Sequence, residues 1–265
     1  MLLDLFGISF LGNNKIIMQN KVILRKLEKY NNVSEDIEEK YEFYLLDLEI
    51  KKILFKYLEI LEDSLKAQLV KNIGNDFLDE NIFREKFLEK RKKFNSEKIE
   101  ELQKRYKKID ENIFFMELTF WELVRYFKDL KNEFKEQIIG FYWFRKFSIF
   151  ESWFFSIRYL RNLVCHWENI FNRNFWEKPL WKKLSKIFNL KTNDFILYIA
   201  ILEIFWKILK IDNEFLFEKL KKVFNKQKNL PVWGQISKIE IEAWQVFIQQ
   251  LYSSFIKKSN LNYKK

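Results

Sequence analysis

One stretch of the chain, from Phe150 to Trp176, holds the residues whose types and spacing could do chemistry. It contains the only histidine of the protein, His166, and the pair Arg161-Asn162 shortly before it. An imidazole with a pKa near ~6.5 can serve as acid or base at neutral pH, and a planar guanidinium matches two phosphate oxygens. Asn162, one helical turn before His166, could orient the imidazole or hold a phosphate oxygen. The combination indicates proton transfer beside a phosphate.

The composition disfavours other catalytic sets. One histidine and one cysteine are too few soft ligands for a zinc site. Cys165 is adjacent to His166, but on a helix it would point about 100° away, so we interpret it as a small core residue and not as a nucleophile. The carboxylates at 35–39 lack a specific spacing for Mg²⁺, and no P-loop or dinucleotide-binding glycine pattern occurs. We therefore expect neither a metal nor a cofactor.

A helix is expected to position these residues. No glycine or proline lies between Gly140 and Pro179, which predicts a long helix over most or all of 150–176. With a period of 3.6 residues, the basic and polar side chains of this helix fall on or near one face. They are Arg158, Arg161, Asn162, His166, Asn169 and Arg173.

The hexapeptide RNLVCH, residues 161–166, has the spacing R-N-x-x-x-H and resembles the signature of the HEPN superfamily of helical nuclease and nucleic-acid-binding domains. More narrowly, RYLRNLVCHWENIFNR (158–173) resembles the abortive-infection (Abi) branch in the AbiD/AbiF group, whose motif reads approximately L-R-N-x-x-A-H-x-x-R-L-W-N-R. The closing Asn172-Arg173 also matches. Cys165 replaces the usual alanine, Asn169 an arginine and Phe171 a tryptophan.

Other segments extend this similarity over roughly residues 45–210. Residues 45–70 resemble the first core helix of the family, in which an I-E-x-x-L-R element recurs; Glu62 matches its glutamate and Lys66 replaces its arginine. This pair could form a surface ion pair or lie near the site. Residues 112–134 resemble a further family region, with Trp121 and either Leu123 or Leu130 as candidate anchors.

The resemblance implies a metal-independent endoribonuclease that arrests the growth of phage-infected bacteria and leaves 2′,3′-cyclic phosphate and 5′-hydroxyl ends. It implies that Arg161 binds the scissile phosphate, that His166 acts as acid or base and that Asn162 orients. The expected RNA-binding residues are Arg158, Asn169, Arg173 and Lys66. Since one chain supplies one imidazole, pairing two chains about a two-fold axis would bring two copies of the motif into one cleft, so we expect a homodimer.

Two alternatives stay open. The first is a non-catalytic RNA-binding protein, or a toxin held inactive by a bound small RNA. The second is a helical protein-interaction module whose aromatic surface, for example Trp176, Trp181 and Trp233, docks a protein partner.

Composition and charge limit the possible partners and the cellular compartment. The net charge of +11 favours an anionic partner such as nucleic acid, although an A+T-rich genome also yields a chain rich in Lys, Asn, Ile and Phe. A single cysteine excludes an internal disulfide and indicates a reducing compartment. The first residues lack the basic start of a signal peptide, and no apolar run approaches the roughly 20 residues of a membrane span. We expect a cytoplasmic protein that has no membrane partner.

Few glycines and prolines and long 3.6-residue periodicities predict an all-α fold, a HEPN-type helical bundle with additional helices and a charged helical side arm. The expected core is 34–80 with 111–210. It includes a helix that Ser34 caps and Gly74 ends, and a second helix after Thr192 that packs on the signature helix. The arm, 81–110, breaks at Asn95-Ser96; it is either solvated or lies along a nucleic-acid backbone. Residues 1–33 give no clear pattern, and 211–265 form C-terminal helices packed on the core.

Overall fold

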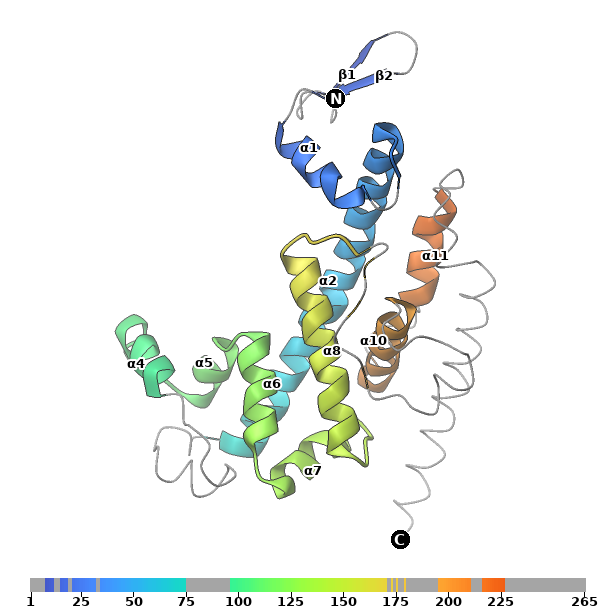
Figure 1. Cartoon of the computed structure of the whole chain (residues 1–265). Helices are drawn as coiled ribbons and strands as arrows, with labels where there is room; N and C mark the ends of the chain where they lie inside the picture. The colour runs from blue at the N-terminus through green and yellow to red at the C-terminus, as the bar shows by residue number, and fades with distance from the viewer. Residues whose placement is uncertain are drawn as a thin grey trace.

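A computed structural model describes residues 8–11, 15–18, 21–31, 34–74, 96–170, 195–210 and 216–226, together with Arg173, Phe175 and Pro179. The predicted all-α bundle is confirmed (Figure 1). Its α-helices are α1 Lys21–Leu27, α2 Ile37–Ile73, α4 Ser96–Arg105, α5 Glu111–Met116, α6 Phe120–Asp129, α7 Asn132–Phe141, α8 Phe147–Cys165, α10 Phe195–Leu209 and α11 Leu216–Lys226.

The longest described helix, α2, is the spine of the bundle. Its 37 residues extend for about 55 Å, and helices from both halves of the chain pack along it (Figure 1). Leucines and isoleucines at spacings of three and four form its buried stripe. It ends at Gly74, at φ 62°, as predicted, but the predicted cap Ser34 is wrong. Asp36 caps α2 instead, because its carboxylate accepts from the backbone N–H groups of Glu38 and Glu39.

Helix α8 lies against α2, α6, α7 and α10. Its buried face contributes Phe150 and Phe154 to an aromatic cluster with Tyr142 and Phe205, in which ring centroids lie 4.4 to 6.0 Å apart. Every position from 197 to 206 of α10 is buried, so the prediction of a helix that packs on α8 is confirmed. The cluster fixes α8 on its inner side and leaves one narrow stripe toward solvent.

Three short helices, α5, α6 and α7, join the two long ones. Leu123 and Leu130 are fully buried, whereas Trp121 is 47% exposed and is therefore not a core anchor. Thr119 and Glu122 start α6 with a reciprocal capping box, which fixes where this helix begins.

The described part of the charged arm is α4, which begins at Ser96 as predicted; residues 81–95 lie outside the described residues. Figure 1 shows α4 beyond α5 at the edge of the molecule. Leu102 is nevertheless fully buried, and Tyr106, just after α4, donates to Glu117 at 2.5 Å. Arg105 also pairs with Glu117, so this half of the arm is attached to the bundle.

The N-terminal segment, which the sequence left unassigned, adds a small antiparallel hairpin of β1 Ile8–Leu11 and β2 Lys15–Met18. Helix α1 and the 3-10 helix η2, Glu28–Tyr30, follow it and pack against the first part of α2. No helix within the described ranges has the length and apolarity to cross a membrane.

Candidate functional site

The predicted site residues begin on the solvent side of α8. Arg158, Arg161, Asn162 and Cys165 are all partly exposed, while the intervening Leu160, Leu163 and Val164 are buried. The alternation follows from the helical period, because the apolar residues face α2 and α10. The structure thus brings the arginines and Asn162 onto one stripe, as expected.

A helix over most of the stretch 150–176 is confirmed, but α8 ends at Cys165, so the expectation that Asn169 and Arg173 continue its face is wrong. Trp167 adopts a left-handed conformation at φ 55°. The N–H of Glu168 donates to the carbonyl of Leu163 at 2.9 Å and that of Trp167 to Val164 at 3.3 Å. This is a Schellman end, for which glycine is the usual signal, so a tryptophan in that position conceals it in the sequence.

His166 therefore lies at the C-terminal end of α8 and not within it. Its backbone N–H still donates to Asn162 O at 2.9 Å, which keeps the two residues one turn apart. The imidazole is exposed, and Trp167 beside it is 53% exposed. Arg161, Asn162 and His166 are thus gathered at one accessible helix end, whereas the predicted continuation of their face to Asn169 and Arg173 does not exist.

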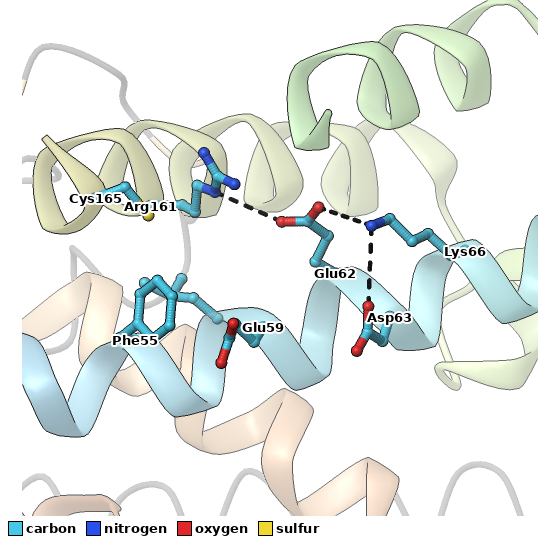
Figure 2. A pocket seen from close by; sticks show the side chains of 8 residues that line it. Phe55, Glu59, Glu62, Asp63, Lys66, Arg161 and Cys165 are labelled. Carbon is cyan, nitrogen blue, oxygen red and sulfur yellow. Dashed lines mark ion pairs between the residues drawn. The ribbon is translucent and has the colours of Figure 1, made fainter. Parts of the chain in front are cut away.

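Arg161 is held by a carboxylate from α2. Figure 2 shows Glu62 between Arg161 and Lys66, with its oxygens 3.5 Å from Arg161 Nε and 3.0 Å from Lys66 Nζ. The Glu62 and Lys66 side chains are only 11% and 9% exposed. Because Glu62 approaches Nε, the terminal nitrogens of the guanidinium can still face a second anion. The expected Glu62–Lys66 ion pair is present and belongs to the site.

Lys66 has a second contact, the carbonyl of Met116, to which Nζ donates at 3.2 Å. An ammonium that is mostly buried between Glu62 and this carbonyl does not reach outward. Its position does not favour the predicted contact with RNA. Lys66 instead supports the carboxylate that orients Arg161.

A small pocket of about 150 Å³ lies between α2 and α8 at this point (Figure 2). Three carboxylates (Glu59, Glu62 and Asp63) line it against two cations, so its charge does not suit a phosphate. A phosphate would approach Arg161 from the Asn162 and His166 side instead. Cys165 also lines the pocket, and burial raises the pKa of its thiol, which agrees with a structural cysteine and not a nucleophile.

The segment after the helix, residues 166–170, is called here the post-helix loop, and it turns toward the N-terminal segment. Asn169 is buried and its Nδ2 donates to the carbonyl of Lys29 at 2.7 Å. Lys29 Nζ in turn pairs with Glu168 at 2.9 Å. The position of Asn169 therefore does not favour the predicted contact with RNA, because the turn at Trp167 carries its side chain inward.

A buried carboxylate that the sequence reading missed fixes the same loop. Asp47 Oδ1 accepts from the N–H of Ile170 at 3.3 Å, and Oδ2 accepts from Tyr30 Oη at 2.6 Å and from Lys51. Burial raises the pKa of Asp47 and lowers that of Lys51, while their ion pair counters both shifts. An Asp and a Lys four residues apart inside an apolar helical stripe were the available signal.

Arg173 also makes contacts within the chain. Its Nε donates to Tyr159 Oη and its Nη1 to Asn169 O, each at 3.3 Å, and Glu168 lies 3.7 Å away. It joins the post-helix loop to α8 while a third of its side chain stays exposed. Asn172 and Phe171, the other residues of the closing motif, lie outside the described residues.

Arg158 lies one turn before Arg161 and Asn162. Its guanidinium carbon is 5.6 Å from the ring centre of Trp121 and 5.1 Å from that of Phe155. In the part of the chain that the structure describes, no group of three His, Cys, Asp or Glu side chains could hold a metal ion. The arrangement offers an imidazole, an oriented guanidinium and an amide at one exposed helix end.

The sequence model of the Abi-like protein family matches residues 15–172, more than half of the chain. This range includes the hairpin strand β2, the spine α2, all of α8 and the post-helix loop. No curated protein and no solved structure shows significant similarity.

Proposed function

We propose, from the premise that the chain belongs to the Abi-like protein family, that it acts in abortive infection as a metal-independent endoribonuclease of the HEPN type. Abortive infection is the defence in which an infected bacterium stops growing before the phage multiplies. Arg161, Asn162 and His166 carry the activity.

The observation that carries this proposal is the accessible end of α8 that holds all three residues, with Arg161 held by Glu62. RNA contains its own nucleophile, the 2′-hydroxyl. A base removes its proton, the oxygen attacks the adjacent phosphorus, and the 5′-oxygen leaves with a proton from an acid. The terminal nitrogens of Arg161 stabilise the charge that develops on the phosphorane oxygens, and His166 transfers a proton.

The reaction needs both an acid and a base, and each chain has one histidine. A homodimer that brings two copies of His166 into one cleft supplies both groups. The exposed Trp167 beside His166 and the half-exposed Phe55 at the pocket rim support a covered site, because a second chain would remove both from water.

The test compares the wild type with His166→Ala and Arg161→Ala on single-stranded RNA in EDTA, with Lys52→Ala on the exposed side of α2 as a control. The wild type is expected to cut RNA, spare DNA and leave 2′,3′-cyclic phosphates. Each site variant should lose at least about 100-fold in rate while circular dichroism and thermal unfolding stay unchanged. Cleavage by the His166→Ala protein at the wild-type rate would contradict the proposal.

A second candidate is a non-catalytic RNA-binding protein. The basic charge of +11 and the arginines of the α8 stripe favour it. It predicts tight, salt-sensitive binding that persists in His166→Ala, with no cutting by the wild type. The tryptophans considered for a protein-docking module, Trp176, Trp181 and Trp233, lie outside the described residues.

A further inference from the structure

An aromatic and basic patch lies on α6 and α8, next to the proposed site. It consists of Trp121, Arg125, Lys128, Phe155 and Arg158. Arg125 and Arg158 place their guanidinium carbons 5.4 Å and 5.6 Å from the ring centre of Trp121. Arg158 and Lys128 lie 5.1 Å and 5.6 Å from that of Phe155. Three cations thus surround two rings on one surface.

Trp121 is not part of the buried face of α6. Helix α6 already buries Phe120, Leu123, Val124 and Phe127, while Trp121 keeps 47% of its surface in water. Tryptophan and arginine are the residue types most enriched among those that dominate binding surfaces. The nearby carboxylate of Glu122 accepts from the N–H of Thr119 in the capping box and is thereby committed to the helix start.

Two of the cations of the patch, Arg125 and Lys128, are exposed. Within the described ranges, no carboxylate lies at ion-pair distance from Arg125 or Lys128. Arg125 and Lys128 therefore bring positive charge to the exposed ring of Trp121. This pair of features is typical of sites for single-stranded nucleic acid, in which bases stack on aromatic or guanidinium planes and cations follow the backbone.

The patch is continuous with the proposed site. Arg158 precedes Arg161 by three residues on the same exposed stripe, which is about 5 Å along the helix axis. An RNA whose scissile phosphate lies at Arg161 would therefore have its neighbouring nucleotides over Arg158 and Trp121. A duplex fits poorly, because its bases are stacked on one another and offer no free face.

We propose that this patch binds single-stranded RNA beside the cut, with one base stacked on Trp121 and flanking phosphates held by Arg125 and Arg158. The inference rests on the proposed function for its substrate and adds the strandedness of that substrate and a stacking subsite.

The test measures binding separately from cutting. Fluorescence anisotropy of a labelled single-stranded RNA is recorded with the His166→Ala chain, alone and combined with Trp121→Ala, Trp121→Phe or Arg125→Ala. Phe141→Ala is the matched control, since Phe141 is a comparably exposed aromatic (43%) on α7, outside the patch. Trp121→Ala should weaken binding about tenfold or more, whereas Trp121→Phe should keep most of the affinity. Duplex RNA of the same sequence should bind weakly and respond little to either change.

Equal affinity of Trp121→Ala and its parent would overturn the proposal, as would an equal loss for single-stranded and duplex RNA. Size-exclusion chromatography tests whether a second protein chain, and not RNA, occupies the patch. If Trp121→Ala turns a dimer into a monomer, the patch is a protein interface. The two proposals fail separately. If RNA binds at Trp121 but the wild type does not cut, the proposed nuclease activity is wrong and the proposed binding patch stands. If the wild type cuts and Trp121→Ala changes neither cutting nor binding, the patch is wrong and the nuclease activity stands.

Discussion

At the scale of single residues, Glu62 is the group on which two cations of the site depend. Its carboxylate is nearly buried, yet it lies between Arg161 from α8 and Lys66 one turn further along α2. A buried ammonium without a carboxylate is costly, so Glu62 both stabilises α2 against α8 and limits the orientations of Arg161. Glu62 therefore contributes both to the stability of the fold and to the proposed chemistry.

Replacing Glu62 by Ala should lower the free energy of unfolding by about 2 kcal/mol, because Lys66 keeps only the Met116 carbonyl and the more distant Asp63 carboxylate, 3.9 Å away, as partners. RNA cleavage should also fall, since Arg161 loses its orienting contact. Urea unfolding and initial cleavage rates check both effects. Glu59→Ala is the control on the exposed side of the same helix, with an expected change within about 0.5 kcal/mol. Indistinguishable stabilities of the two variants would contradict the shared role of Glu62.

Only part of this residue pattern could be predicted from the sequence. The Glu62–Lys66 pair follows from a spacing of four on a helix, and the grouping of Arg158, Arg161 and Asn162 follows from the same period. The contact of Glu62 with Arg161 joins two helices far apart in the chain, so no local rule reaches it. The burial of Lys66 depends on Met116, which approaches only when α5 packs on α2.

At the scale of elements, the post-helix loop decides where His166 lies. Two anchors hold it, one to the N-terminal segment through Asn169 and the Lys29 carbonyl, and one to α2 through Ile170 and buried Asp47. Helices α2 and α10 could be predicted from the sequence, because their buried faces require apolar residues at helical spacing. The end of α8 could not, because a tryptophan takes the left-handed position in which glycine is the usual signal.

Asn169→Ala should destabilise the protein by about 1 kcal/mol, because a largely buried hydrogen bond to the Lys29 carbonyl is lost. Cleavage should slow while RNA affinity stays the same, since the loop positions His166 and does not contact RNA. Thermal unfolding measures the change in stability, kcat measures the change in cleavage rate, and a binding titration measures the RNA affinity. Lys29→Ala removes only the exposed ion pair with Glu168 and should change stability by less than about 0.5 kcal/mol. A large loss of RNA affinity in Asn169→Ala would restore its predicted role as an RNA contact.

A second element-scale prediction concerns the junction of α10 and α11. Glu203 is buried on α10 and accepts from the N–H of Leu216, at the start of α11, at 2.6 Å. Burial raises the pKa of Glu203 from its ordinary 4.5 to about 7. The folded protein therefore binds this proton more tightly than the unfolded chain. The resulting stability, about 3 kcal/mol, is fully present below pH ~4.5 and is lost as pH rises through about 7.

Glu203→Gln should remove this component of the pH dependence, because the amide oxygen still accepts from Leu216 and does not titrate. The measurement is the difference in unfolding free energy between wild type and variant from pH 5 to 8. The wild type should lose stability relative to Glu203→Gln as pH rises over this range. Parallel curves for the two proteins would show that Glu203 does not titrate there.

At the scale of the whole molecule, the helices place the proposed chemistry and the proposed RNA path on one side of the bundle. The stripe of α8 carries Arg158 toward Trp121 and Arg161 toward Glu62, while α2 and α10 support it from within. The net charge of +11 adds a long-range attraction for RNA that falls with salt, whereas stacking on Trp121 should not. Salt dependence thus separates the general charge from the local patch.

The last prediction tests whether two chains share one catalytic site. Each chain has one imidazole, which cannot act as both acid and base in the same step. The His166→Ala protein should be inactive alone. When it is mixed with an equal amount of wild-type chain and the subunits exchange, about half of randomly paired dimers hold one intact His166 and about a quarter hold two. Because a cleft with a single imidazole lacks either the acid or the base, only the dimers with two intact chains should cut. Cleavage should therefore fall to about half of that of the same amount of wild-type chain alone. Different affinity tags on the two chains verify the exchange. If mixed pairs form and the cleavage per wild-type chain does not change, the two imidazoles are not shared across a dimer in this way.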